Sequence, residues 1–147
     1  MRRVSIKAFL IGGIVDVVSS ALLGIPLIIL AIAIKGLPAV SREQVGPALV
    51  RVIHGSALLY SIQLLIGFGC SVLGGYVAGR IAKHDHILNG LLASGVCMAI
   101  GVYSIAKGKS VDPLAVQLVL LLIVTPGAGI LGGYLASRQS PTRSSTA

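Results

Sequence analysis

Four long apolar runs constrain the fold of this chain more than any other feature of its sequence. They cover residues 8–34, 56–79, 87–106 and 111–136, with charged residues between each run and the next. Each run reaches the roughly 20 residues that an α-helix needs to cross the hydrocarbon core of a bilayer. Because that core contains no water, each run must satisfy its own backbone hydrogen bonds as a helix. We therefore predict an all-α integral membrane bundle of four transmembrane helices.

The composition excludes a water-soluble fold. Of the 147 residues, 55% are hydrophobic and only 11% are charged, whereas a soluble domain has about 25% charged residues. We predict a single four-helix transmembrane domain over residues 1–137. The stretch 138–147 is polar and contains a proline, and we expect it to be a disordered cytoplasmic tail.

The net charge of +8 comes from Lys and Arg residues that lie mainly between the apolar runs and at their ends. No basic face is interleaved with aromatic residues, so we expect the partner to be a lipid bilayer and not a nucleic acid. Seven of the twelve cations fall on the side of the two termini and five on the other side. This bias predicts that both termini are cytoplasmic.

One sizeable segment, residues 35–55, connects the first two runs. Ser41 followed by Gln44 resembles a capping box, which predicts a short interfacial helix from about Arg42. Pro38 and Pro47 fit an irregular connector equally well.

An eight-residue phrase occurs twice. LGGYVAGR at residues 73–80 and LGGYLASR at residues 131–138 share six of eight positions, at an offset of 58 residues. Each copy ends the second helix of a predicted two-helix hairpin, so both copies leave the membrane on the same side. The sequence therefore predicts two tandem helical hairpins related by an axis along the membrane normal.

Small residues recur every fourth position through the repeated phrases and through the first run. Such rows let helix backbones approach closely, and packing drives helix association in lipid. The residues predicted to pack helices are Gly12, Gly24, Gly67, Ser71, Gly75, Gly79, Gly129, Gly133 and Ser137. The alternative is that the two glycine-rich ends face each other across the axis and surround a polar pathway.

Each phrase also carries a tyrosine followed four residues later by an arginine. Tyr76 and Tyr134 lie about one turn inside the helix end, where aromatic rings suit the headgroup boundary. Arg80 and Arg138 can extend along apolar surface to reach water. We expect these four residues to be interfacial anchors.

Asp16 lies deep inside the first apolar run. At 1.5 Å per residue it is about 12 Å from the start of that run, and exposure to lipid there would cost about 2.5 kcal/mol or more. It must therefore face protein, water or a partner. Gly12, Asp16 and Ser20 share one helix face and Ser19 lies beside it, so Asp16, Ser19 and Ser20 form a candidate intramembrane polar site.

Two interpretations of Asp16 remain open at this point. An intramembrane carboxylate is by default a candidate functional group, for instance in proton-coupled transport. Alternatively, it pins the first helix to the others through hydrogen bonds or through an ion pair with Arg80 or Arg138.

Other chemistry-bearing residues give weaker patterns. Cys70 and Cys97 lie in apolar runs, where cysteine behaves as a small hydrophobic residue. His84, Asp85 and His86 are consecutive and resemble a metal site, but their side chains diverge in a short loop, so we expect a solvated turn. We find no nucleophile with a base. We therefore expect no catalytic residues, no metal, no cofactor and no enzymatic activity.

The motifs FLIGGIVDVVSSALLG and GGYVAGRIAKHDHILNG, with the second glycine-rich ending, resemble small uncharacterised four-helix bacterial membrane proteins with a GGYxAxR signature. The resemblance implies a multi-pass protein of the bacterial inner (plasma) membrane and no particular activity. The chain is more loosely similar to small multidrug resistance transporters, which carry an essential carboxylate in the first of four helices, a place held here by Asp16. It departs from them in having no Trp, few aromatic residues and a long first outer loop.

Two functions follow as expectations. The first is a non-enzymatic membrane protein that acts through helix packing, as an oligomer of itself or as an accessory subunit of a membrane assembly. The alternative is a small proton-coupled transporter or channel that uses Asp16.

Overall fold

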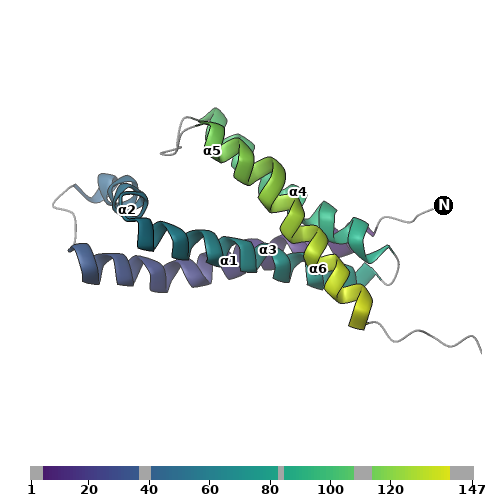
Figure 1. The fold of residues 1–147 in the computed structure, drawn as a ribbon. Coiled ribbons are helices and arrows are strands. Elements are labelled where there is room, and N and C mark those ends of the chain that lie inside the picture. Colours follow the sequence, from purple (N-terminus) through teal and green to yellow (C-terminus); the bar gives the residue numbers. More distant parts are fainter. Residues whose placement is uncertain (1–4, 37–40, 83–84, 108–113, 140–147) are drawn as a thin grey trace, which may run out of the picture.

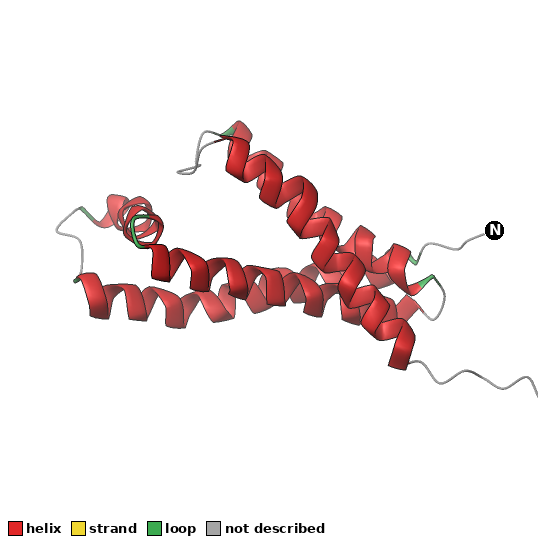
Figure 2. Cartoon of the chain, in the orientation of Figure 1, coloured by secondary structure: helices red, strands yellow, loops and turns green. Residues whose placement is uncertain are grey.

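The computed structural model describes residues 5–36, 41–82, 85–107 and 114–139. Every regular element within these ranges is a helix (Figure 2). Four helices are long and apolar enough to cross a membrane. They are α1 (Ile6–Lys35), α3 (Ala57–Ala82), α4 (His86–Ala106) and a fourth, Leu120–Gln139, made of the π-helical turn η2 (Leu120–Val124) and α6 (Thr125–Gln139). The short helix α5 (Leu114–Val119) directly precedes it. The predicted all-helical fold class with four long apolar helices is confirmed.

Polar contacts fix where two of the long helices begin. At the start of α1, the Ser5 hydroxyl accepts a hydrogen bond from the backbone N–H of Ala8 at 3.3 Å. The backbone N–H of Ser5 donates to Oδ1 of Asn89, 3.1 Å away in the first turns of α4. Asn89 is fully buried and also donates to the carbonyl oxygen of Asp85 at 3.1 Å. These bonds tie the starts of α1 and α4 together.

The end of the fourth helix differs from the prediction. We expected a disordered tail from residue 138, but α6 continues through Arg138 to Gln139. The side chain and backbone of Gln139 both accept hydrogen bonds from α3, which holds this last turn in place. The rest of the predicted tail, residues 140–147, lies outside the described residues.

The connection between the first two long helices contains a short helix, one of the two alternatives left open. A 3₁₀ turn, η1 (Arg42–Gln44), leads into α2 (Val45–His54). The expected capping box does not form, because the Ser41 side chain makes no capping hydrogen bond and only its carbonyl oxygen accepts from the Gln44 N–H, at 2.9 Å. Ile53 of α2 packs on a buried cluster with Leu27 and Leu59, so α2 covers one end of α1 and α3 (Figure 1).

The long helices form two hairpins that cross. α1 packs on α3, and α6 packs on both α3 and α4. The hairpins meet at the end that carries the start of α1 and the end of α6, and they diverge toward α2 and α5 (Figure 1). The fold therefore has a closed end and a splayed end.

Glycines permit the close approach at the closed end. A Cβ atom on Gly12 of α1 would lie 2.6 Å from the carbonyl oxygen of Gly74 in α3. A Cβ atom on Gly75 of α3 would lie 2.6 Å from the carbonyl oxygen of Gly129 in α6, and one on Gly133 of α6 would lie 2.5 Å from that of His86 in α4. Real Cβ atoms do not come this close to a backbone atom, so glycine is required at these crossings.

The two copies of the repeated phrase pair with each other within one chain. Gly75 of the first copy faces α6, and Gly132 of the second copy faces the backbone of Val72 and Tyr76 in α3. In the alignment at an offset of 58, however, Gly75 corresponds to Gly133, which faces α4. The two copies thus use opposite members of the glycine pair for their mutual contact. The repeated glycines are therefore not equivalent in packing.

Three of the predicted packing residues do not mediate helix crossings. No atom outside the local helix lies within 4 Å of a Cβ built on Gly24 or Gly67, because both lie where the hairpins have diverged. The hydroxyl of Ser137 donates to the carbonyl oxygen of Tyr134 in its own helix at 2.7 Å. The fully buried Ala136 takes the contact instead, with its Cβ 2.8 Å from a Cβ built on Gly79.

Candidate functional site

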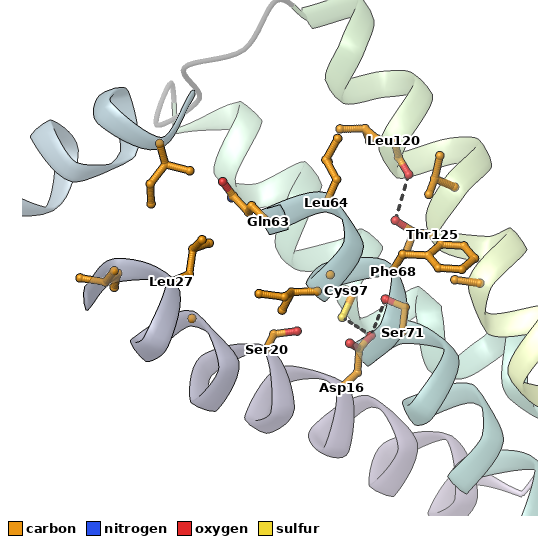
Figure 3. Close-up of a pocket in the computed structure, with 17 residues that line it drawn as sticks. Asp16, Ser20, Leu27, Gln63, Leu64, Phe68, Ser71, Cys97, Leu120 and Thr125 are labelled. Atoms are coloured by element: carbon orange, nitrogen blue, oxygen red, sulfur yellow. Dashed lines mark hydrogen bonds between the residues drawn. The ribbon is translucent and has the colours of Figure 1, made fainter. Parts of the chain in front are cut away.

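A cavity of about 480 Å³ lies between the diverging hairpins. Residues from α1, α2, α3, α4, η2 and α6 line it (Figure 3). Most of its wall is apolar, with side chains such as Leu27, Ile66 and Phe68. Its polar side chains are Asp16, Ser20, Gln63, Ser71, Cys97 and Thr125. The cavity thus places a small number of polar groups in an apolar chamber, as ligand sites commonly do.

Asp16 is the centre of these polar groups. It is only 2% exposed, and its Oδ2 atom accepts hydrogen bonds from the Ser71 hydroxyl at 3.0 Å and from the Cys97 thiol at 2.9 Å. Figure 3 shows these donors converging on the carboxylate from α3 and α4. Three helices therefore meet at a single oxygen atom.

The glycine crossing explains why Asp16 sits there. Gly12 and Gly74 bring α1 and α3 into backbone contact, and Asp16 lies one turn after Gly12. Ser71 lies three residues before Gly74 on the facing helix, so the two side chains oppose each other. A Cβ built on Gly74 would lie 2.8 Å from the Cβ of Asp16, which shows how little room separates the carboxylate from the crossing.

The ion pair considered for Asp16 does not form. Arg80 donates to the carbonyl oxygen of Gln139 at 3.2 Å, and the Arg138 guanidinium lies 5.0 Å from the centre of the Tyr134 ring. Among the described residues, Asp16 contacts hydrogen-bond donors but no cationic side chain. Both donors, the Ser71 hydroxyl and the Cys97 thiol, bond to Oδ2, and neither bonds to Oδ1.

The other two residues of the predicted polar site separate. Ser20 lines the same cavity as Asp16. Ser19 instead lines a second, smaller groove with Leu22, Cys70 and Leu73, on another side of the contact between α1 and α3. Consecutive residues point about 100° apart on a helix, so these adjacent serines fall on different sides of that contact. The structure therefore does not bring Ser19 into the cavity that Asp16 and Ser20 line.

The sequence interpretation missed Cys97, Gln63 and Thr125 as wall residues. Cys97 gave no signal, because a cysteine in an apolar run usually packs as a small hydrophobic residue. Gln63 did give a signal, because a polar amide side chain inside an apolar run is unusual. Its Oε1 atom is buried and has no hydrogen-bond partner among the described residues.

Thr125 marks a break in the fourth helix. Its hydroxyl donates to the carbonyl oxygen of Leu120 at 2.9 Å, and its backbone N–H donates to the same oxygen across the π-helical turn. Pro126 follows directly and has no N–H to continue the normal pattern. Single π-helical turns are often found at functional sites, and this one lies on the cavity wall.

The expected interfacial anchors interact at the closed end. The Tyr76 hydroxyl donates to Oε1 of Gln139 at 2.5 Å, and the Arg80 guanidinium lies 5.9 Å from the Tyr76 ring centre. In the second copy the Arg138 guanidinium lies over the Tyr134 ring. Each repeated phrase thus ends in a cation–π pair, and the first is also bonded to the end of α6.

The histidine turn shows a structural use for one of its residues. His84 lies outside the described residues. The Nδ1 atom of His86 lies 2.5 Å from the carbonyl oxygen of Gly79, which joins the start of α4 to the end of α3. Within the described ranges, no three His, Cys, Asp or Glu side chains are grouped to hold a metal ion.

Comparisons with protein-family models, curated proteins and solved structures found no match to this chain.

Proposed function

We propose that this chain is a small multi-pass membrane protein that binds a proton and a cationic solute alternately at Asp16. Transport of the solute is thereby coupled to transport of the proton. The observation that carries the proposal is the buried Asp16 carboxylate on the wall of a cavity, bonded to donors from two other helices. Of the two expected functions, the geometry favours the transport alternative.

Electrostatics supports this proposal. A buried carboxylate is costly unless its charge is compensated, and Asp16 has Ser71 and Cys97 as hydrogen-bond donors but no cationic partner among the described residues. A bound proton and a bound cation each remove the uncompensated charge. Because both would occupy the same carboxylate, they exclude one another, which is the requirement for coupled exchange.

The packing of the glycines argues against the first expectation. Assembly through small residues needs a free face rich in them. The predicted packing glycines that border the cavity are Gly24 and Gly67, and those that contact neighbouring helices of the same chain are Gly12, Gly75, Gly79, Gly129 and Gly133. Their role in the proposed function is to hold the closed end together below the cavity.

A location in the bacterial inner membrane with cytoplasmic termini completes the proposal. Large apolar side chains such as Leu22, Ile29 and Leu65 are more than 60% exposed on the outer faces of α1 and α3, which suits contact with lipid. The Tyr and Arg anchors lie at the closed end. With that end cytoplasmic, the cavity occupies the opposite part of the bundle.

Infrared spectroscopy of the purified protein in lipid bilayers tests the proposal. We expect the protonated-carboxyl band of Asp16 to grow as the pH is lowered from about 9 to about 4, and to be absent in Asp16→Asn. Ser19→Ala is the matched control, because Ser19 faces a different groove. A band that stays constant over this range, with no change on adding cations, would contradict the proposed function.

A further inference from the structure

The hydrogen-bonding groups next to Asp16 restrict the chemistry of a ligand. The Ser71 hydroxyl and the Cys97 thiol each donate to Oδ2. The hydroxyl of Thr125, farther along the wall, donates to the carbonyl oxygen of Leu120. These three donors are therefore occupied, while Oδ1 of Asp16 accepts no hydrogen bond from a described residue. A ligand at this end must bring a donor of its own.

The charge of the site requires that this donor be cationic. A carboxylate forms its strongest hydrogen bonds with ionised donors, and the cavity wall contains no Lys, Arg or His among the described residues. A metal cation fits poorly, because Ca²⁺ takes about six to eight oxygen ligands and Mg²⁺ requires near-ideal octahedral coordination. The polar side chains of the wall are instead one carboxylate, three hydroxyls, one thiol and one amide, and the Ser71, Cys97 and Thr125 groups already donate hydrogen bonds within the protein.

Beyond Asp16 the cavity favours an apolar ligand body. From the carboxylate toward α2 the wall includes Leu27, Ile53 and Ile66. The volume of about 480 Å³ falls within the range of about 300 to 1,000 Å³ that small-molecule sites occupy. The cavity therefore offers one anionic acceptor at Asp16, one neutral acceptor at Oε1 of Gln63 and an otherwise mostly apolar wall.

From these observations we propose that the ligand is a protonated aliphatic amine, held by an N–H···Oδ1 hydrogen bond to Asp16 with its alkyl body among Leu27, Ile53 and Ile66. An ammonium group has donors and no acceptor, which complements the free Oδ1. This inference rests on the proposed function, and it specifies the substrate class. It separates amines with N–H groups from quaternary ammonium ions, which have the charge but no donor.

Calorimetric titration of the purified protein with three probes that share a six-carbon chain tests the inference. The probes are hexylamine, its trimethylammonium counterpart and hexanol, so charge and N–H donation are varied separately. We expect hexylamine to bind at least about tenfold more tightly than either of the others. Asp16→Asn should lose at least about tenfold of the hexylamine affinity, since it keeps acceptor capacity but removes the charge. Ser19→Ala should bind as the parent protein does.

The outcomes separate this inference from the proposed function. Equal binding of hexylamine and its trimethylammonium counterpart, both dependent on Asp16, would overturn the selection for N–H donors and leave a cation site. Hexylamine binding that is unchanged in Asp16→Asn would overturn the amine site. A carboxyl band that responds to pH while no probe binds would also overturn the amine, with the proton-binding function intact. Circular dichroism of Asp16→Asn confirms that the variant remains helical.

Discussion

Gly12 and Gly74 cross so closely that each faces the backbone carbonyl oxygen of the other. A Cβ on Gly12 would lie 2.6 Å from the Gly74 oxygen, and a Cβ on Gly74 would lie 2.7 Å from the Gly12 oxygen. This crossing sets the separation of α1 and α3 at the level where Asp16 meets Ser71. The spacing of two glycines therefore determines the geometry of the candidate site.

Replacing Gly74 by Ala tests that relationship. The new methyl group must displace the backbone of α1 or the Asp16 side chain, and overpacking of this kind costs about 1 to 3 kcal/mol. We expect the thermal unfolding midpoint in detergent to fall and the carboxyl band of Asp16 to shift.

Gly67→Ala provides the control on the same helix. Nothing lies within 4 Å of its added Cβ, and alanine favours a helix over glycine by up to about 1 kcal/mol. We expect stability equal to or above that of the parent protein. Equal losses in the two variants would contradict the crossing at Gly74.

The four long helices were predictable because their length and low polarity are properties of the sequence itself. That Gly24 and Gly67 lie outside the helix crossings was not predictable, for two physical reasons. A spacing of four residues drifts by about 40° per step around a helix of 3.6 residues per turn, so residues two or three steps apart no longer face the same way. The hairpins also diverge at this level, which leaves both glycines beside the cavity.

The candidate site was predictable only in its central residue. Asp16 stands out in any sequence because a carboxylate in an apolar run is costly. Its partners depend on which helices meet, and Cys97 lies 81 residues away in the chain. Ser71 was predicted as a packing residue because of its small size, and size alone does not indicate that its hydroxyl donates to the Asp16 carboxylate.

Ser71→Ala measures the contribution of one donor to the site. Removing a donor from a buried carboxylate leaves part of its desolvation uncompensated, so we expect a loss of about 1 to 3 kcal/mol in the free energy of unfolding. Chemical denaturation in mixed micelles gives this value. Ser137→Ala is the matched control, because the Ser137 hydroxyl donates within its own helix, to the Tyr134 carbonyl oxygen. A loss in the control as large as that in Ser71→Ala would show that the effect is not specific to Asp16.

Gly132→Ala distinguishes packing within the chain from packing between chains. A Cβ at this position would overlap the Val72 carbonyl oxygen and lie 2.6 Å from the backbone nitrogen of Tyr76, both in α3 of the same molecule. The variant should therefore lose about 1 to 3 kcal/mol of stability, and its oligomeric state should not change, as measured by analytical ultracentrifugation in detergent.

The control for Gly132→Ala lies on the same helix. A Cβ on Gly127 has no neighbour within 4 Å, so Gly127→Ala should not lower the stability and should leave the oligomeric state in detergent unchanged. If Gly132→Ala instead dissociated a larger complex into smaller ones while each chain kept its stability, the repeated glycines would hold separate chains together. That result would favour assembly through helix packing over the proposed transport function, because the contact between α3 and α6 would then be an interface between copies and not the closed end of one cavity.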